Sequence, residues 1–345
     1  MLYFRGMAIK VGINGFGRIG RVFFRFAHKN PAIEIVAIND LASTEAMASL
    51  LQRDTVYGKA PFIVSVKEDN LLVDGKQIKV LFEKDPNKIP WGEHGVDVVV
   101  ESTGAFDSFE KAQAHLVGGA KRVVISAPAK DAATNTIGAT VLVGINEDKL
   151  KTCKVSANAS CTTNAGSPLI AILDEALGIE HALLSTTHAL TASQALVDGP
   201  SKGKGREWRA GGHNLVPTST GAAIAVTQAL PQLDKKFDGI AIRVPVLCGS
   251  LVDVTFVSKR PTSAEEVNAI LRKAAALHRW EGIFTTTDEE LVSSDIVGDL
   301  HASIADLALT RVVGGTLVKG MAWYDNEMGY VPTLLRHVIK AGSYV

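Results

Sequence analysis

The chain has 345 residues, of which 46% are apolar and 21% charged, and this length and composition predict two globular domains. Lys and Arg number 36, as do Asp and Glu, so the net charge of zero argues against a dedicated nucleic-acid binder. No apolar run approaches the roughly 18 residues of a membrane span. Three cysteines without CxxC spacing argue against a disulfide framework or a zinc site and indicate a reducing compartment, so we expect no metal.

The first part of the chain, residues 7–160, alternates strand and helix patterns. Residues 1–6 resemble the remnant of a protease-cleavage linker and are excluded from the fold. Asp74-Gly75 predicts a hairpin turn. The alternation predicts an α/β domain of Rossmann type, a doubly wound parallel sheet with helices on both faces. The predicted strands are 9–13, 33–38, 96–100 and 122–125, and the predicted helices are 18–28, 43–51 and 108–116.

From residue 161 to 324 the pattern changes to long strands with few helices. This predicts an α+β domain with a mostly antiparallel sheet. Pro168 either starts its helix or bends it, and residues 198–212 form a long polar loop of a length that is usually functional. A last helix, within 325–345, is expected to complete the first domain. The predicted helices are 168–177 and 262–276, and the predicted strands are 182–191, 240–244, 251–258, 302–309 and 316–324.

A glycine-rich motif, Gly15-Phe16-Gly17-Arg18-Ile19-Gly20, follows the first strand and opens the first helix. Glycines there let the backbone turn tightly and approach a pyrophosphate at the helix N-terminus. Asp40, twenty residues beyond Gly20, ends the next strand, where its carboxylate can bind a ribose 2′-hydroxyl and would repel a 2′-phosphate. An ordinary glycine turn is the alternative. The combined pattern predicts a dinucleotide site that prefers NAD to NADP.

Cys161 lies among hydroxyl and amide side chains, in Ser160-Cys161-Thr162-Thr163-Asn164. Such neighbours suit a turn before a helix, where backbone N–H groups and the helix dipole lower a thiol pKa and favour a nucleophilic thiolate. The alternative is a small buried cysteine at a turn. Cys153 and Cys248 lie in apolar surroundings, and we expect both to be buried and unreactive.

A cysteine nucleophile needs a base, and His188 is the candidate because it ends a strand among hydroxyl side chains. A strand histidine satisfied within the core is the alternative. Four other histidines fall in helical or polar stretches, and we expect them at the surface: His28, His115, His278 and His337.

Two features point to an anion. Thr218-Ser219-Thr220-Gly221 precedes a helix-like run, where hydroxyl and N–H groups form either an anion site or a plain helix cap. Arg243 interrupts an apolar run, and a buried arginine needs either a structural carboxylate or a bound phosphate.

These residues resemble the phosphorylating glyceraldehyde-3-phosphate dehydrogenases over nearly the whole chain. The resemblance is carried by the glycine motif and Asp40, by Glu101-Ser102-Thr103-Gly104, by residues 120–128, by the Ser-Cys-Thr-Thr-Asn run, by Arg243-Val244-Pro245 and by Trp323-Tyr324-Asp325-Asn326-Glu327. Departures are Ala165 where many relatives have a second cysteine, an extra residue Ala157, and an altered arginine pattern in the 198–212 loop, so either Arg206 or Arg209 could contact phosphate.

The resemblance implies a role for each matching position. It implies Cys161 as nucleophile and His188 as its base. Substrate and inorganic phosphate would be held by Ser160, Thr162, Thr191, Thr220, Gly221 and Arg243. NAD would be held by Gly15, Gly17, Arg18, Ile19, Gly20, Asp40, Lys84, Ser126 and Asn326.

The implied reaction is NAD-dependent oxidation of D-glyceraldehyde 3-phosphate to 1,3-bisphosphoglycerate through a cysteine thiohemiacetal and thioester, in glycolysis or gluconeogenesis. The implied protein is a cytoplasmic homotetramer with no membrane segment, and its 198–212 loop would line a subunit interface. Two alternatives remain open: an erythrose-4-phosphate dehydrogenase, which shares the fold and the Cys/His pair, and a non-catalytic NAD-binding interaction protein.

Overall fold

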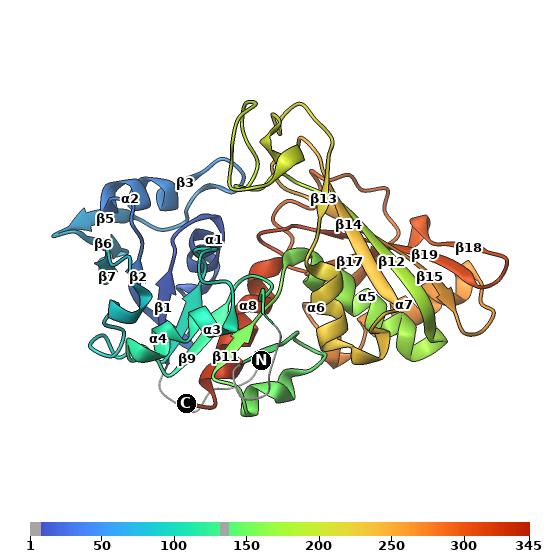
Figure 1. Cartoon of the computed structure of the whole chain (residues 1–345), viewed down its shortest axis with the longest axis horizontal. Helices are drawn as coiled ribbons and strands as arrows, with labels where there is room; N and C mark the ends of the chain where they lie inside the picture. Colours follow the sequence, from blue (N-terminus) through green and yellow to red (C-terminus); the bar gives the residue numbers. More distant parts are fainter. Residues whose placement is uncertain (1–7, 132–137) are drawn as a thin grey trace. The chain divides into compact units, whose positions relative to one another are not determined.

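A computed structural model describes residues 8–131 and 138–345, and it divides into two compact units. Unit 1 comprises the chain up to Ala159 together with Thr333–Val345, and unit 2 comprises Ser160–Pro332. In Figure 1 the body of unit 1 runs from blue to green and unit 2 from green to orange-red. The segment interpreted as a linker remnant, residues 1–6, lies outside the described residues.

Unit 1 contains the strand-helix alternation that the sequence predicts. Its parallel strands are short and almost wholly buried, as for β8, because helices cover both faces of such a sheet. The elements are β1 (Ile9–Asn14), α1 (Arg18–Ala27), β2 (Ile33–Asn39), α2 (Thr44–Gln52), β3 (Arg53–Asp54), β4 (Gly58–Lys59), β5 (Val64–Lys67), β6 (Asn70–Val73), β7 (Lys76–Leu81), β8 (Val98–Glu101), α3 (Phe109–Ala112), α4 (Ala114–Val117), β9 (Arg122–Ile125), β10 (Gly138–Thr140) and β11 (Val155–Ala157).

The large sheet of unit 1 has the strand order β10-β11-β9-β8-β1-β2-β7-β6-β5 among the described residues. All pairs from β10 to β7 are parallel, and β7, β6 and β5 form an antiparallel extension in which the predicted turn at Asp74-Gly75 joins β6 to β7. Chain order reverses at β1, which lies between β2 and β8. The carboxyl ends of strands at such a switch point form the usual ligand crevice of doubly wound sheets. The prediction of a Rossmann-type sheet is confirmed.

Three expectations for unit 1 need correction. The helix expected at 108–116 is two short helices, α3 and α4. His115 and His337, expected at the surface, are both fully buried. The ring of His115 lies between Trp91 and Glu101, so each ring nitrogen has a polar partner inside the core. Helical spacing does not reveal such partners because they come from distant parts of the chain.

Unit 2 has fewer helices and longer strands, as expected. The burial of β15 alternates along its length, which indicates a sheet with one face covered and the other more open. The elements are α5 (Cys161–Leu177), β12 (Ile179–His188), β13 (Val216–Ser219), α6 (Ala222–Ala229), β14 (Phe237–Arg243), β15 (Ser250–Ser258), α7 (Ala264–Ala275), β16 (Phe284–Thr287), β17 (Ser303–Asp306), β18 (Arg311–Val313) and β19 (Leu317–Tyr324). The helix that follows, α8 (Tyr330–Gly342), begins in unit 2 but belongs mostly to unit 1.

The sheet of unit 2 has the order β13-β14-β12-β15-β19-β17-β16, with β18 paired to β19. Most neighbours are antiparallel, and the exceptions among described strands are the parallel pairs β12–β14 and β16–β17. Helix α5 packs against β12, β15, β17 and β19 (Figure 1). The prediction of an α+β domain with a mostly antiparallel sheet is confirmed.

Helix α5 begins at Cys161, seven residues before the start that Pro168 suggested. Ser160 caps it: its Oγ accepts from the Thr163 N–H at 3.0 Å, and the Thr163 hydroxyl accepts from the Ser160 N–H at 3.4 Å. This reciprocal capping box satisfies two donors at the helix start, the N–H groups of Ser160 and Thr163. Pro168 therefore lies inside the helix, where it removes one backbone hydrogen bond.

The last helix, α8, runs through the boundary between the units and belongs to unit 1 from Thr333 onward. There the His337 ring contacts Asn158 Oδ1 at 3.0 Å and Ser156 Oγ at 2.8 Å. Over the residues that the structure describes, no helix is both long enough and apolar enough to cross a membrane.

Candidate active site

The glycine motif has the backbone geometry that a nucleotide loop requires. Gly15 has φ +91°, and a Cβ there would lie 2.6 Å from the Thr103 backbone nitrogen. A Cβ on Gly20 would lie 2.2 Å from the Gly15 carbonyl oxygen, so the helix could not approach the loop. Gly17 is exposed, and apart from its own atoms and those of its chain neighbours no described heavy atom lies within 4 Å of its Cβ position, which leaves the approach to the N-terminus of α1 open.

Asp40 follows the carboxyl end of β2 and faces this loop. One carboxylate oxygen accepts from the Phe16 N–H at 2.6 Å, and the other accepts from the Ala42 N–H at 2.9 Å. Each carboxylate oxygen can accept more than one hydrogen bond, so Asp40 retains the capacity to accept from a ribose hydroxyl. The loop and the acidic residue predicted from sequence are thus brought together.

The other residues predicted to bind the cofactor lie in different environments. The Arg18 guanidinium pairs with Asp54 and lies over the Tyr57 ring, so only the Arg18 and Ile19 backbone groups belong to the open helix N-terminus. Lys84 is exposed. Ser126 follows β9, and its hydroxyl donates to the Glu101 carbonyl oxygen at 3.0 Å. Asn326 belongs to unit 2, where its Oδ1 accepts from the Ser250 hydroxyl at 3.0 Å and the Gly249 N–H at 3.2 Å.

Within unit 2, Cys161 and His188 meet. Cys161 is the first residue of α5 and His188 the last of β12, and Sγ lies 3.3 Å from Nε2. His188 Nδ1 lies 2.7 Å from the Ala189 carbonyl oxygen. A proton on Nδ1 donates to that oxygen and leaves the Nε2 lone pair facing the thiol. The arrangement joins a nucleophile to a base that is itself oriented, the geometry of covalent catalysis.

The surroundings shift both pKa values. Burial, together with the positive charge of Arg243, lowers the pKa of His188 to about 3. Burial raises the pKa of the Cys161 thiol, while Arg243 and the Thr162 backbone N–H act in the opposite direction. The sequence-based expectation of a lowered thiol pKa is therefore wrong in sign for this state, because desolvation outweighs the helix N-terminus. His188 is consequently neutral above the acid range, so its Nε2 lone pair can accept a hydrogen bond from the Cys161 thiol.

Arg243 ends β14, and its Nη1 lies 2.6 Å from His188 Nδ1 and 3.4 Å from the Ala189 carbonyl oxygen. Its Nε is buried and has no hydrogen-bond partner in the described structure. No described carboxylate pairs with it, so the structural ion pair considered from sequence is not present. A partly buried cation with an unpartnered donor is suited to an anionic ligand.

Tyr324 is a residue near this site that sequence analysis did not select. Its hydroxyl lies 2.8 Å from the Thr162 hydroxyl and 2.8 Å from the Thr186 hydroxyl, and its ring lies edge-on to His188. It therefore ties the first turn of α5 to β12 and fixes the separation of Cys161 and His188. The sequence feature that could have identified Tyr324 was its place in the Trp-Tyr-Asp-Asn-Glu run that carries the family resemblance.

The hydroxyl side chains predicted to bind phosphate have different environments. Ser160 caps α5, and Thr162 is buried against Tyr324. Thr191 contacts Ser193 Oγ at 3.0 Å, and Thr220 accepts from the Ala222 N–H at 3.1 Å, with Gly221 as the N-cap of α6. Among described contacts, no hydrogen bond joins Thr191 or Thr220 to the Cys161, His188 and Arg243 group.

The 198–212 loop is ordered around Glu207, whose carboxylate accepts from Ser193 Oγ at 2.8 Å and from Thr218 Oγ1 at 2.6 Å. The two candidate arginines differ. Arg209 pairs with Asp198, its Nε lying 2.8 Å from Oδ2, whereas Arg206 pairs with no carboxylate in the described part of the chain. Arg206 is thus the loop arginine whose charge is available.

Comparison with known proteins gives consistent matches. Residues 9–109 match the family described as glyceraldehyde 3-phosphate dehydrogenase, NAD binding domain, and residues 160–326 match its C-terminal domain. The chain is 48% identical over 340 residues to a glyceraldehyde-3-phosphate dehydrogenase of Streptomyces coelicolor, covering 98% of this chain and 99% of the relative. It is 47% identical to that of Geobacillus stearothermophilus, covering 98% of each chain, and 46% identical to glyceraldehyde-3-phosphate dehydrogenase 1 of Bacillus subtilis, covering 97% of this chain and all of the relative.

Proposed function

The chain belongs to the glyceraldehyde-3-phosphate dehydrogenase family, and from that premise we propose how its own residues carry the reaction. It is an NAD-dependent oxidoreductase of glyceraldehyde 3-phosphate. The observation that carries the residue assignments is the 3.3 Å contact between Cys161 Sγ and His188 Nε2 at the N-terminus of α5.

Cys161 acts as the nucleophile. Its sulfur adds to the aldehyde carbon and forms a thiohemiacetal, while the thiol proton passes to the carbonyl oxygen by way of His188. The position of Cys161 at the start of α5 supports this role, because the unpaired N–H groups of the first turn stabilise negative charge. Cys153 and Cys248 are buried away from such a turn.

His188 acts as the base of the oxidation. NAD, when bound, supplies the acceptor for the hydride that leaves the thiohemiacetal carbon. The hydroxyl proton passes to Nε2 of His188, and the carbon becomes the thioester of Cys161. Inorganic phosphate then attacks the thioester carbon, the Cys161 sulfur leaves, and an acyl phosphate, 1,3-bisphosphoglycerate, is formed. Dividing the reaction at a covalent intermediate replaces one difficult step by two easier ones.

Arg243 holds an anion, either the substrate phosphate or inorganic phosphate. Nδ1 of His188 can form only one of its two close hydrogen bonds. If Nδ1 carries a proton and donates it to the Ala189 carbonyl oxygen, it cannot also accept from Nη1 of Arg243, and two donors face each other. An anion that accepts from Arg243 relieves this conflict and leaves His188 as a base at Nε2. Ser160, Thr162, Thr191, Thr220 and Gly221 are proposed to complete the phosphate positions.

The residues of unit 1 fit NAD. The open Gly17 position and the closely packed Gly15 and Gly20 leave the N-terminus of α1 for the pyrophosphate, and Asp40 would hold the adenosine ribose. Lys84, Ser126 and Asn326 are proposed as further contacts. We propose residues 7–160 with the 325–345 segment as the NAD-binding domain and residues 161–324 as the catalytic domain.

A cytoplasmic homotetramer is the proposed assembly. Three apolar side chains flanking the 198–212 loop are strongly exposed, Leu196 at 87%, Val197 at 73% and Leu215 at 70%. Exposed apolar side chains that form a contiguous patch are typical of an interface, and these three are proposed to contribute to one. The reducing compartment is proposed from the sparse, odd number of cysteines without CxxC spacing. Light scattering after gel filtration would measure the mass of the assembly.

The activity is tested by the appearance of NADH absorbance with glyceraldehyde 3-phosphate, with and without inorganic phosphate. Sustained turnover that requires phosphate supports the proposal, and turnover without phosphate contradicts it. Erythrose 4-phosphate as a second substrate and NADP as a second cofactor complete the comparison. Higher efficiency with erythrose 4-phosphate would assign the chain to the alternative substrate.

A further inference from the structure

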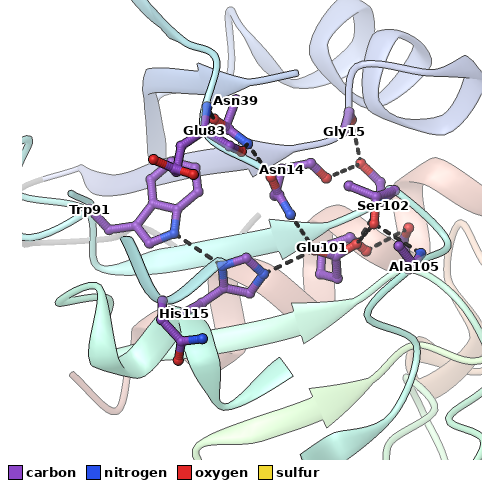
Figure 2. A network of polar contacts seen from close by, with 12 residues as sticks. Asn14, Gly15, Asn39, Glu83, Trp91, Glu101, Ser102, Ala105 and His115 are labelled. Atoms are coloured by element: carbon purple, nitrogen blue, oxygen red, sulfur yellow. Dashed lines mark hydrogen bonds and ion pairs between the residues drawn. The ribbon is translucent and has the colours of Figure 1, made fainter. Parts of the chain in front are cut away.

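Three polar side chains stand in one row at the carboxyl ends of three neighbouring parallel strands. Asn14 ends β1, Asn39 ends β2 and Glu101 ends β8. Asn14 is the register partner of both Asn39 and Glu101, so the three side chains point to the same side of the sheet. All three are buried. Figure 2 shows them linked in a continuous polar network.

Glu101 is the centre of this network. The residue is only 2% exposed, and its carboxylate accepts four hydrogen bonds, two on each oxygen. Oε2 accepts from Asn14 Nδ2 at 2.6 Å and His115 Nε2 at 2.9 Å. Oε1 accepts from the Thr103 N–H at 2.8 Å and the Thr103 hydroxyl at 2.5 Å. All four partners donate, which is the arrangement that stabilises a buried carboxylate.

The network ends at two N–H groups that can only donate, those of the Trp91 indole and the Glu83 backbone, and these two groups determine which atom donates in each hydrogen bond between them. The Trp91 indole N–H can only donate, and it donates to His115 Nδ1 at 3.1 Å, so His115 carries its proton on Nε2 and donates to Glu101. At the other end, the Glu83 N–H donates to Asn39 Oδ1 at 2.9 Å. Asn39 Nδ2 therefore donates to Asn14 Oδ1 at 2.8 Å, and Asn14 Nδ2 donates to Glu101.

The row adjoins the proposed cofactor residues on two strands. Asn14 directly precedes Gly15, whose N–H donates to the Asn39 carbonyl oxygen at 2.8 Å. Asn39 directly precedes Asp40. The Ser102 hydroxyl, next to Glu101, donates to the Gly15 carbonyl oxygen at 2.6 Å (Figure 2). A displacement of the Glu101 carboxylate would thus move both the start of the glycine loop and the residue that carries the ribose carboxylate.

We propose that Glu101 is a positioning residue for the adenosine diphosphate half of NAD. It acts through Asn14 on the glycine loop and through Asn39 on Asp40, and it need not touch the cofactor. The inference rests on the proposed function, because that proposal assigns the loop and Asp40 to NAD. The proposal also assigns a role to the run Glu101-Ser102-Thr103-Gly104, which the sequence analysis used to support the resemblance but to which it assigned no function.

Glu101→Gln is the sharpest test because glutamine keeps the shape and replaces one acceptor oxygen with a donor. At the Oε2 position the new amide would face two donors that the network ends hold in place. At the Oε1 position it would face the Thr103 N–H, and the Thr103 hydroxyl already accepts from the Ala105 N–H at 3.0 Å. Either placement forces a shift. We expect the dissociation constants of NAD and ADP-ribose to rise together by about tenfold or more, the effect of one mispaired buried donor.

Isothermal titration with ADP-ribose measures this without turnover. At saturating NAD, kcat should be nearly unchanged while KM for NAD rises, and the alkylation rate of Cys161 should be that of the wild type. The matched control is Asn146→Ala, which removes another buried amide of unit 1, one that bonds to Leu142 and Thr140 outside the network. It should lower the melting temperature and leave ADP-ribose binding unchanged.

An unchanged ADP-ribose dissociation constant for Glu101→Gln, with a lowered melting temperature as in the control, would overturn the inference and make Glu101 a purely structural residue. Should Glu101→Gln fail to fold, Asn39→Ser removes the amide that links Asn14 to the residue before Asp40, together with its contacts to Glu83. This variant must weaken ADP-ribose binding by a similar factor, and full affinity in it refutes the inference. Failure of the wild type to bind ADP-ribose would overturn the proposed cofactor site, and this inference with it.

Discussion

Replacing His188 with asparagine removes the proposed base and changes little else at its position. A carboxamide can still donate to the Ala189 carbonyl oxygen, but it cannot accept and hold a proton. The perturbation therefore separates proton transfer from packing around Cys161 and Tyr324. The exposed His181 on the same strand provides a matched control, His181→Asn.

The size of the effect follows from what else could accept the proton. His188 is 4% exposed, so bulk water has little access to replace it. Tyr324 is near, but burial raises its pKa, and its hydroxyl is occupied by Thr162 and Thr186. Among the described residues that contact Cys161 or His188, none is a second base. The full contribution of general base catalysis, about 10²–10⁴-fold, should therefore be lost from kcat. This corresponds to about 3–5 kcal/mol of transition-state stabilisation.

Stopped-flow measurement of the first turnover, with NADH absorbance as the signal, reports the oxidation step directly. Iodoacetamide should also alkylate Cys161 more slowly at neutral pH, because the thiol loses its proton acceptor at 3.3 Å. ADP-ribose binding should be unaffected. A first-turnover rate within about tenfold of the wild type would show that His188 is not the base, since general base catalysis is worth more than that.

Four further changes test separate parts of the account. Cys161→Ser should abolish aldehyde oxidation and spare ADP-ribose binding, and iodoacetate should label Cys161 first in the wild type; preferential labelling of Cys153 would contradict the assignment. Asp40→Ala should shift the ratio of efficiencies from NAD toward NADP by about tenfold or more, since removing a carboxylate–phosphate repulsion is worth at least about 1.4 kcal/mol, and an unchanged ratio counts against a ribose contact. Arg243→Ala should raise KM for inorganic phosphate or the phosphorylated substrate and slow Cys161 alkylation, because Arg243 lowers the pKa of that thiol; a lower melting temperature with unchanged KM would make the arginine structural. His337→Gln should weaken the acid sensitivity of folding. Burial lowers the pKa of His337 from 6.5 to about 3. Between these two values the unfolded chain takes up a proton that the folded chain does not. The free energy of unfolding therefore has its full value above pH 6.5 and decreases as the pH falls toward 3. Urea titrations at several pH values in that window should show a slope smaller by about 1.4 kcal/mol per pH unit in the variant, and an equal slope would exclude the effect.

The features that the sequence predicts well are those determined by residues close to one another in the chain. The glycine motif and Asp40 lie on consecutive elements, and the backbone conformation of Gly15 is a property of that one residue. Strand and helix periodicity likewise depends on contiguous residues, which is why both sheets were predicted correctly. Cys161 was selected as a candidate nucleophile from its immediate hydroxyl neighbours, and its role stays a prediction.

The features that sequence did not predict depend on contacts between distant residues. Asn14 and Glu101 are 87 positions apart, and only strand register brings them together. His115 has a helical pattern typical of a surface residue, yet its ring is buried between Trp91 and Glu101. The start of α5 was misplaced because the helix was read from Pro168 onward, whereas in the structure Ser160 and Thr163 cap a helix that begins at Cys161.

The central claim is that a thioester forms on Cys161 and phosphate discharges it. Mass spectrometry of the protein incubated with glyceraldehyde 3-phosphate and NAD, without inorganic phosphate, tests it most directly. Tryptic cleavage after Lys154 and Lys202 isolates Cys161 from both other cysteines. The account predicts a 3-phosphoglyceroyl adduct on that peptide, formed together with about one NADH per chain, and its disappearance when phosphate is added. NADH formation with no adduct on the Cys161 peptide, or an adduct that phosphate does not discharge, would contradict it.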